Sequence, residues 1–172
     1  MRQITFALLL AVALPLVGAA QSVAPKATQT TNENGYGYGY IFAAPGGSSN
    51  GGGGTLHIGG GGEGVLKNGV GIGAELGYLY PFEGIDEGLG TFSVNGAYHF
   101  LKASRSEKVT PFVTAGYTGF FRSGYANGFN FGGGVNYWFK KRVGLRFEFR
   151  DNVFAADGAA HLLNVRIGLT FR

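Results

Sequence analysis

Apolar and polar residues alternate along most of the chain after residue 34. In VGLRFEFRD (143–151), for example, Val143, Leu145, Phe147 and Phe149 alternate with glycine and charged residues. A period of two is typical of a β-strand with two unlike faces. Turn-rich segments separate eight such runs: 35–44, 54–65, 69–81, 89–101, 109–122, 127–139, 142–153 and 161–172. Their even spacing predicts a single all-β domain rather than alternating strands and helices.

The two faces of these runs differ in bulk. One face carries large apolar residues, and the other carries glycine, short polar residues and a few ions. An eight-stranded barrel has an interior only just wide enough for side chains, so about thirty large residues cannot be inside it. We therefore expect the bulky face to be outside, against lipid, with the small and polar face in the lumen. Strand number and length then predict an eight-stranded antiparallel up-and-down transmembrane β-barrel.

The same rule places the aromatic residues of YGYGYIF (36–42) on the outside. It assigns Tyr36, Tyr38, Tyr40 and Phe42 to the lipid face, and Gly37 and Gly39 to the lumen. Outward tyrosines explain this motif without a ligand.

Aromatic residues are predicted at both ends of the apolar belt, where interfacial rings prefer to lie. The last outward residues are Phe100, Phe139 and Phe171 in even runs, and Tyr78, Tyr80, Phe121 and Phe149 in odd runs.

The connections between the runs alternate in composition as well. KNG (67–69) and KKR (140–142) are short and basic, and 102–108 is mostly basic, whereas the other connections are rich in glycine and small residues. If the N-terminus is periplasmic, the basic turns lie at the periplasmic end.

The N-terminus predicts export. Arg2 precedes an apolar segment, Ile4–Val17, and GAAQ (18–21) offers a cleavage site after Ala20. We expect a signal peptide over 1–20, a flexible polar leader over 21–34 and the barrel domain over 35–172. An N-terminal anchor helix is the alternative. The chain has no cysteine, which excludes disulfides and thiolate metal sites.

Three segments resemble the small eight-stranded outer-membrane barrels of the OmpA/OmpX-like type. They are GEGVLKNGVGIGAELGYLY (62–80), GFNFGGGVNYWFKKRVGLRFEFRD (128–151) and NVRIGLTF (164–171). The resemblance implies a Gram-negative-type outer membrane, a signal peptide, and a barrel-assembly machinery that reads an aromatic-ended last strand. In this chain Arg172 follows the final aromatic residue, Phe171.

The lumen face carries ionisable residues, which must find partners because an isolated buried ion is costly. Glu63 is expected on this face near the periplasmic end. The predicted lumen charge network consists of Glu75, Arg146, Glu148, Arg150 and Arg166. Its predicted role is to plug the barrel, and a gated path for small ions is the alternative.

No catalytic or metal site is predicted, and no cofactor. His57, His99 and His161 are scattered, without an evident Ser/Asp triad or metal-ligand spacing. The glycine runs at 51–54 and 59–62 lack the Lys-Ser/Thr of a phosphate-binding loop. The net charge of +4 includes no long Lys/Arg block, so no nucleic-acid partner is expected.

These observations favour a non-enzymatic, monomeric outer-membrane protein with a structural or envelope-interaction role and outer-membrane lipid as its partner. The alternative is a narrow channel or transporter for small solutes. A lipocalin-like soluble binder and an enzyme rank lower.

Overall fold

The computed structural model describes residues 35–49, 53–101, 108–155 and 159–172. The predicted signal peptide (1–20) and leader (21–34) lie outside the described residues. The strands are β1 (Gly35–Ser48), β2 (Gly54–Leu66), β3 (Val70–Pro81), β4 (Leu89–His99), β5 (Val109–Phe121), β6 (Tyr125–Tyr137), β7 (Val143–Ala155) and β8 (Ala159–Phe171). A short 3₁₀ helix, η1 (Ile85–Glu87), lies between β3 and β4.

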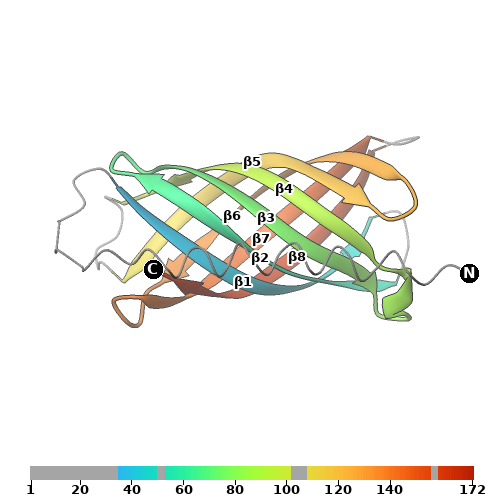
Figure 1. The fold of residues 1–172 in the computed structure, drawn as a ribbon, viewed down its shortest axis with the longest axis horizontal. Helices are drawn as coiled ribbons and strands as arrows, with labels where there is room; N and C mark the ends of the chain where they lie inside the picture. The colour runs from blue at the N-terminus through green and yellow to red at the C-terminus, as the bar shows by residue number, and fades with distance from the viewer. Residues whose placement is uncertain (1–34, 50–52, 102–107, 156–158) are drawn as a thin grey trace, which may run out of the picture. The chain divides into compact units, whose positions relative to one another are not determined.

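The eight strands form a closed antiparallel barrel. Each strand pairs with the next along the chain, and β8 pairs with β1 from Phe171↔Gly39 to Leu162↔Ser48. Figure 1 shows the strands running obliquely around the barrel, as closure of a twisted sheet requires. Closure leaves no sheet edge with unpaired backbone groups. The predicted eight-stranded up-and-down barrel is confirmed.

The strands extend further than the alternation predicts at one end of the barrel, which we call the loop end. β1 continues past residue 44 to Ser48, and β6 begins at Tyr125 rather than near 127. The ladder continues there through pairs such as Gly46↔Asn164. Backbone hydrogen bonds do not need alternating side chains, so strand pairing extends beyond the residues that alternate. At the opposite end, the turn end, Gly69 adopts φ +90 in the tight turn between β2 and β3.

The outside of the barrel is apolar, as predicted for β3 to β8. Ile72 is 70% exposed and Phe149 54%, and Phe131, Val165 and Leu169 are also exposed on this surface. The predicted girdle residues Phe100, Phe139 and Phe171 at the turn end and Phe121 at the loop end are exposed too. Among the described residues, no helix is long and apolar enough to cross a membrane.

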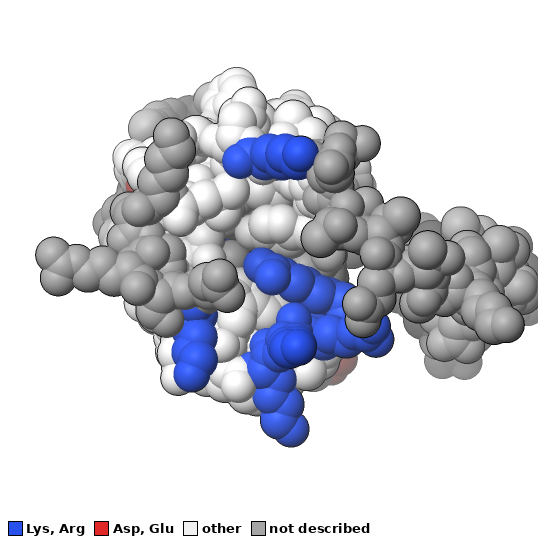
Figure 2. Space-filling model, turned by 90° about the vertical axis from the view of Figure 1, so that its left-hand side faces the viewer, with Lys and Arg blue, Asp and Glu red and all other residues white. Residues whose placement is uncertain are grey.

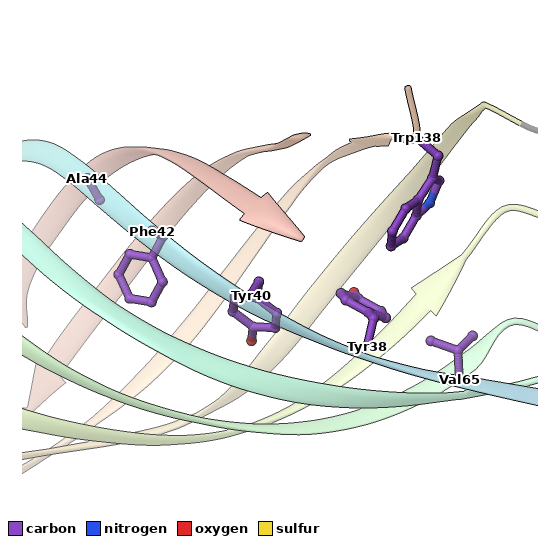
Figure 3. Packing of buried hydrophobic residues seen from close by; sticks show 6 residues of the cluster. All are labelled: Tyr38, Tyr40, Phe42, Ala44, Val65 and Trp138. Atoms are coloured by element: carbon purple, nitrogen blue, oxygen red, sulfur yellow. The ribbon is translucent and has the colours of Figure 1, made fainter. Parts of the chain in front are cut away.

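The predicted orientation of the first strand is wrong. Tyr38, Tyr40 and Phe42 point into the lumen and are at most 7% exposed, while Gly37 is exposed outside. Figure 3 shows these three rings inside the barrel with Ala44, Val65 and Trp138.

Glycines on the neighbouring strands explain this reversal. A Cβ at Gly59 of β2 would lie 2.8 Å from Cζ of Phe42, and a Cβ at Gly61 would lie 3.0 Å from the hydroxyl oxygen of Tyr40. On the other side of β1, a Cβ at Gly168 of β8 would lie 3.3 Å from Cβ of Phe42. The lumen therefore has room for the Phe42 ring between Gly59 and Gly168, and for the Tyr40 ring beside Gly61.

Candidate functional site in the barrel lumen

Glu75 of β3 lies at the centre of the lumen, where it accepts hydrogen bonds from three strands. Nη1 of Arg150 is 2.7 Å from its Oε2, and Nη1 of Arg166 is 3.0 Å from its Oε1. The hydroxyl of Tyr40 donates to Oε1 at 2.7 Å. Glu75 is 3% exposed, so two guanidinium groups and a phenol replace its water shell.

Glu148 is the second acceptor, and it joins two arginines of its own strand. Nε of Arg146 donates to Oε2 at 3.0 Å, and Nε of Arg150 donates to Oε1. The three residues are two positions apart on β7, which places their side chains on one face. Arg166 is directly opposite Glu148 in the β7–β8 register, and its Nη1 lies 3.7 Å from Oε1.

A third carboxylate, Glu63 of β2, extends the cluster toward the turn end. It accepts from the hydroxyl of Tyr38 at 2.9 Å and pairs with Nε2 of the buried His99. Nη1 of Arg146 donates to the Tyr38 hydroxyl at 2.7 Å and lies 3.7 Å from Glu63. Arg146 thus links Glu63 to Glu148.

The structure therefore places all five residues of the predicted network in one buried cluster and adds members that the sequence analysis missed. Tyr38 and Tyr40 supply hydroxyl donors, while Phe42 and Phe112 supply ring faces. The guanidinium carbon of Arg166 lies 3.7 Å from the ring centroid of Phe42, and that of Arg146 lies 3.9 Å from that of Phe112. Gly59, Gly61 and Gly168 were the available signal, because they leave space in the lumen beside the rings of β1.

The cluster is balanced in charge and tightly packed. Three arginines, Arg146, Arg150 and Arg166, face three glutamates, Glu63, Glu75 and Glu148, and each is at most 7% exposed. The space lined by Tyr40, Phe42, Arg146, Glu148, Arg166 and Gly168 admits no water-sized sphere. Buried ions are tolerated when each is paired and hydrogen-bonded, and this arrangement meets that condition.

Apolar and aromatic groups lie above and below the charges. Leu79, Phe120 and Leu162, together with Leu89 and Phe154, form a cluster toward the loop end. At the turn end the guanidinium of Arg172 lies 4.0 Å from the ring centroid of Tyr36 and 3.9 Å from that of Trp138. Arg172, which follows the final aromatic residue of the last strand, therefore stacks on aromatic rings at the end of the barrel.

The three histidines have different partners. Nε2 of His57 lies 2.9 Å from Oγ1 of Thr91, and His99 pairs with Glu63. His161 has an aspartate partner that the sequence analysis did not foresee, because Nδ1 is 2.7 Å from Oδ2 of Asp151. A His–Asp pair orients an imidazole, but catalysis also needs a nucleophile or an activated water. Within the described residues, no group of three or more His, Cys, Asp or Glu side chains could hold a metal ion.

A closed eight-stranded barrel with an apolar outside and a charged interior is the architecture of a small transmembrane β-barrel. The fold matches solved structures of this class. Neisserial surface protein A (NspA) superposes with a TM-score of 0.61 at 14% identity, covering 78% of this chain and 94% of that one. The N-terminal β-barrel domain of Pseudomonas aeruginosa OprF gives 0.57 at 16% identity, covering 80% and 99%.

Escherichia coli outer membrane protein W gives a TM-score of 0.52 at 14% identity, covering 82% of this chain and 99% of that one. At these identities the likeness shows the fold, and it confirms the predicted outer-membrane type of β-barrel. Neither the protein-family models nor the curated proteins include a match to this sequence.

Proposed function

We propose that this chain is a non-enzymatic integral outer-membrane protein with a structural or envelope-interaction role, and that the charge cluster plugs its lumen. In this proposal residues 1–20 direct export, and the barrel-assembly machinery inserts the chain as a monomer. The partner of its outer surface is then outer-membrane lipid.

The apolar outer surface supports membrane insertion. Exposed large apolar residues occur on all eight strands, from Ile41 on β1 to Leu169 on β8. Soluble monomers rarely expose apolar patches larger than a few hundred Å². Burial in a hydrocarbon layer removes this surface from water.

The packing around Glu75 is the observation that carries the plugged-lumen proposal. Its carboxylate is bound by Arg150, Arg166 and Tyr40, which come from three different strands. An ion path through this level would require these groups to separate, leaving buried charges without partners. That cost is several kcal/mol per ion. The same pairing occupies the charged groups that an enzyme would need to keep available for a substrate.

Planar-bilayer recording of the purified, refolded protein tests the proposal. We expect no steady conductance from barrels whose insertion is verified independently by flotation with vesicles. The conductance of the variant Glu148→Gln, which lacks one carboxylate of the cluster, is recorded in the same way for comparison. A steady conductance in the native protein that Arg146→Gln or Glu148→Gln abolishes would instead establish a narrow channel. Recovery of the native chain from buffer as a stable monomer without detergent or lipid would contradict membrane insertion itself.

A further inference from the structure

Basic side chains collect at the turn end of the barrel. They lie in the β2–β3 turn, before β5, in the β6–β7 turn and after β8, and all are exposed. We call these residues the basic collar: Lys67, Lys108, Lys140, Lys141, Arg142 and Arg172. Figure 2 looks onto this end and shows Lys and Arg side chains spread around it, with almost no acidic surface in view.

Four cations of the collar have surroundings unlike those of the lumen arginines. Within the described residues, Lys67, Lys140, Lys141 and Arg142 form no ion pair, and the described parts of these turns contain no Asp or Glu. The guanidinium of Arg172 stacks on Tyr36 and Trp138 and forms no ion pair with a described Asp or Glu side chain. The collar is therefore a concentrated positive surface.

The loop end has the opposite character. Glu83, Asp86 and Glu87 are exposed there, between β3 and β4. The guanidinium of Arg122 donates to the backbone carbonyls of Asp86 at 2.8 Å and Glu87 at 3.0 Å. The hydrogen bonds of Arg122 are thus to neutral groups. Among the described residues, exposed basic side chains dominate the turn end and exposed acidic side chains the β3–β4 connection at the loop end.

The position of the collar along the barrel matches that of lipid headgroups. Three of its cations come one residue after an exposed apolar residue of the outer surface. Lys67 follows Leu66, Lys140 follows Phe139 and Arg172 follows Phe171. Aromatic girdles mark the boundary between hydrocarbon and headgroups. Cations one residue beyond the girdle therefore lie at the height of the phosphates.

Backbone hydrogen bonds fix two segments of the collar. The amide of Lys140 donates to the carbonyl of Val143 at 3.0 Å, and the amide of Arg172 donates to the carbonyl of Arg142 at 2.9 Å. The second bond ties the end of β8 to the β6–β7 turn. Arg172 and the 140–142 segment thus form one patch of the collar.

We propose that the basic collar binds the phosphates of anionic glycerophospholipids, such as phosphatidylglycerol, in the leaflet around the turn end. The inference rests on the proposed membrane insertion. Guanidinium groups form paired hydrogen bonds with phosphate oxygens, and ammonium groups attract them as point charges. Continuity with the aromatic girdle favours a lipid over an acidic protein segment. The leaflet at this end is the periplasmic one if the N-terminus is periplasmic, which favours a glycerophospholipid over lipopolysaccharide.

Site-specific labelling can test this binding because the native chain has no cysteine. Leu169→Cys, which is outward on β8 near the 140–142 turn, would carry a fluorophore close to the collar. Phe121→Cys would carry the same fluorophore at the loop end. Quenching by brominated phosphatidylglycerol is then compared with quenching by brominated phosphatidylcholine in mixed vesicles.

We expect about five-fold or greater selection of phosphatidylglycerol at the Leu169→Cys label, since each basic residue near an anionic surface contributes about a five-fold factor. The Phe121→Cys label should show no preference, and high salt should weaken the effect. The triple variant Lys140→Gln, Lys141→Gln and Arg142→Gln should lower the ratio markedly, because it removes half of the collar's cations. The matched triple variant Glu83→Gln, Asp86→Asn and Glu87→Gln should leave it unchanged.

Equal quenching by both lipids in a correctly inserted barrel would overturn the collar proposal and leave the proposed function standing. So would selection that the triple variant of residues 140–142 leaves unchanged, or a stronger preference for lipopolysaccharide or an acidic peptide than for phosphatidylglycerol. Failure of the native chain to insert into any vesicle would instead overturn the proposed function.

Discussion

β1 and β7 have the same kind of sequence and opposite orientations. Each begins by alternating large residues with small or polar ones, over 35–40 in β1 and 143–150 in β7. In β7 the phenylalanines Phe147 and Phe149 face outward and the arginines face the lumen. In β1 the rings of Tyr38 and Tyr40 face the lumen and glycines face outward.

The difference lies in what the neighbouring strands offer. The inward positions of β2 beside β1 are glycines at 59 and 61, and Glu63 and Glu75 accept hydrogen bonds from the two tyrosine hydroxyls. β7 instead supplies the arginines that neutralise those carboxylates. Alternation defines a strand with two faces, but the volume and charge of the lumen decide which face turns inward.

The strongest way to break this arrangement is to remove its central anion. Glu75→Gln leaves Arg150 and Arg166 without their shared carboxylate, and we expect a loss of about 3–5 kcal/mol in the free energy of unfolding. Urea unfolding in phosphatidylcholine vesicles, followed by the fluorescence of the single tryptophan, Trp138, measures it. The exposed Glu83→Gln serves as the control, with a change near zero. Partial recovery of stability in the double variant Glu75→Gln, Arg166→Gln would support the ionic origin of the loss. Equal losses of stability in Glu75→Gln and in the control Glu83→Gln would contradict it.

A charge on the outer face of β7 tests the other side of the comparison. Phe147→Arg places a cation on the apolar surface, and we expect destabilisation of about 2–4 kcal/mol because the charge meets hydrocarbon. Phe82→Arg, on an exposed residue of the loop end, should cost little. The same unfolding titration checks both variants. A harmless Phe147→Arg would mean that this face does not contact lipid.

The glycines around β1 provide a matched pair. Gly59→Val adds bulk against Phe42 and the backbone of β3, and we expect a loss of about 3 kcal/mol, the upper range for overpacking. Gly62→Val faces outward, where the nearest atom to a new Cβ would be the carbonyl oxygen of Tyr38 at 3.7 Å, so stability should change by less than about 0.5 kcal/mol. Equal losses would show that inward space does not determine the orientation of β1.

The smallest expected effect sharpens the role of the tyrosine hydroxyls. Tyr40→Phe removes one hydrogen bond to Glu75 while both arginines remain, and we expect a loss of about 1.5 kcal/mol. Tyr137→Phe, on an exposed outer position, is the control and should be neutral within experimental error. Vesicle-based unfolding of the two variants in parallel gives the difference. A neutral Tyr40→Phe would mean that the ring alone holds β1 in place.

Much of this molecule could be predicted from particular residues. The alternation around Phe147 and Leu169 predicted strands with a lipid-facing side, and the inward spacing of Arg146, Glu148 and Arg150 predicted a lumen cluster. The missed features involve residues distant in sequence. Tyr40 and Glu75 are 35 positions apart, and Tyr38 and Arg146 are 108 apart. His161 and Asp151 are only 10 apart, but the β7–β8 register decides that they meet.

The sequence by itself determined the strands, their number and the apolar belt, because these follow from a local period of two and from the total bulk of each face. Only the tertiary structure decided that the aromatic rings of β1 fill the lumen and that Arg172 stacks on Tyr36 and Trp138. Each of these depends on space and charge supplied by other strands. Closure of the barrel brings those strands together, and no local pattern records it.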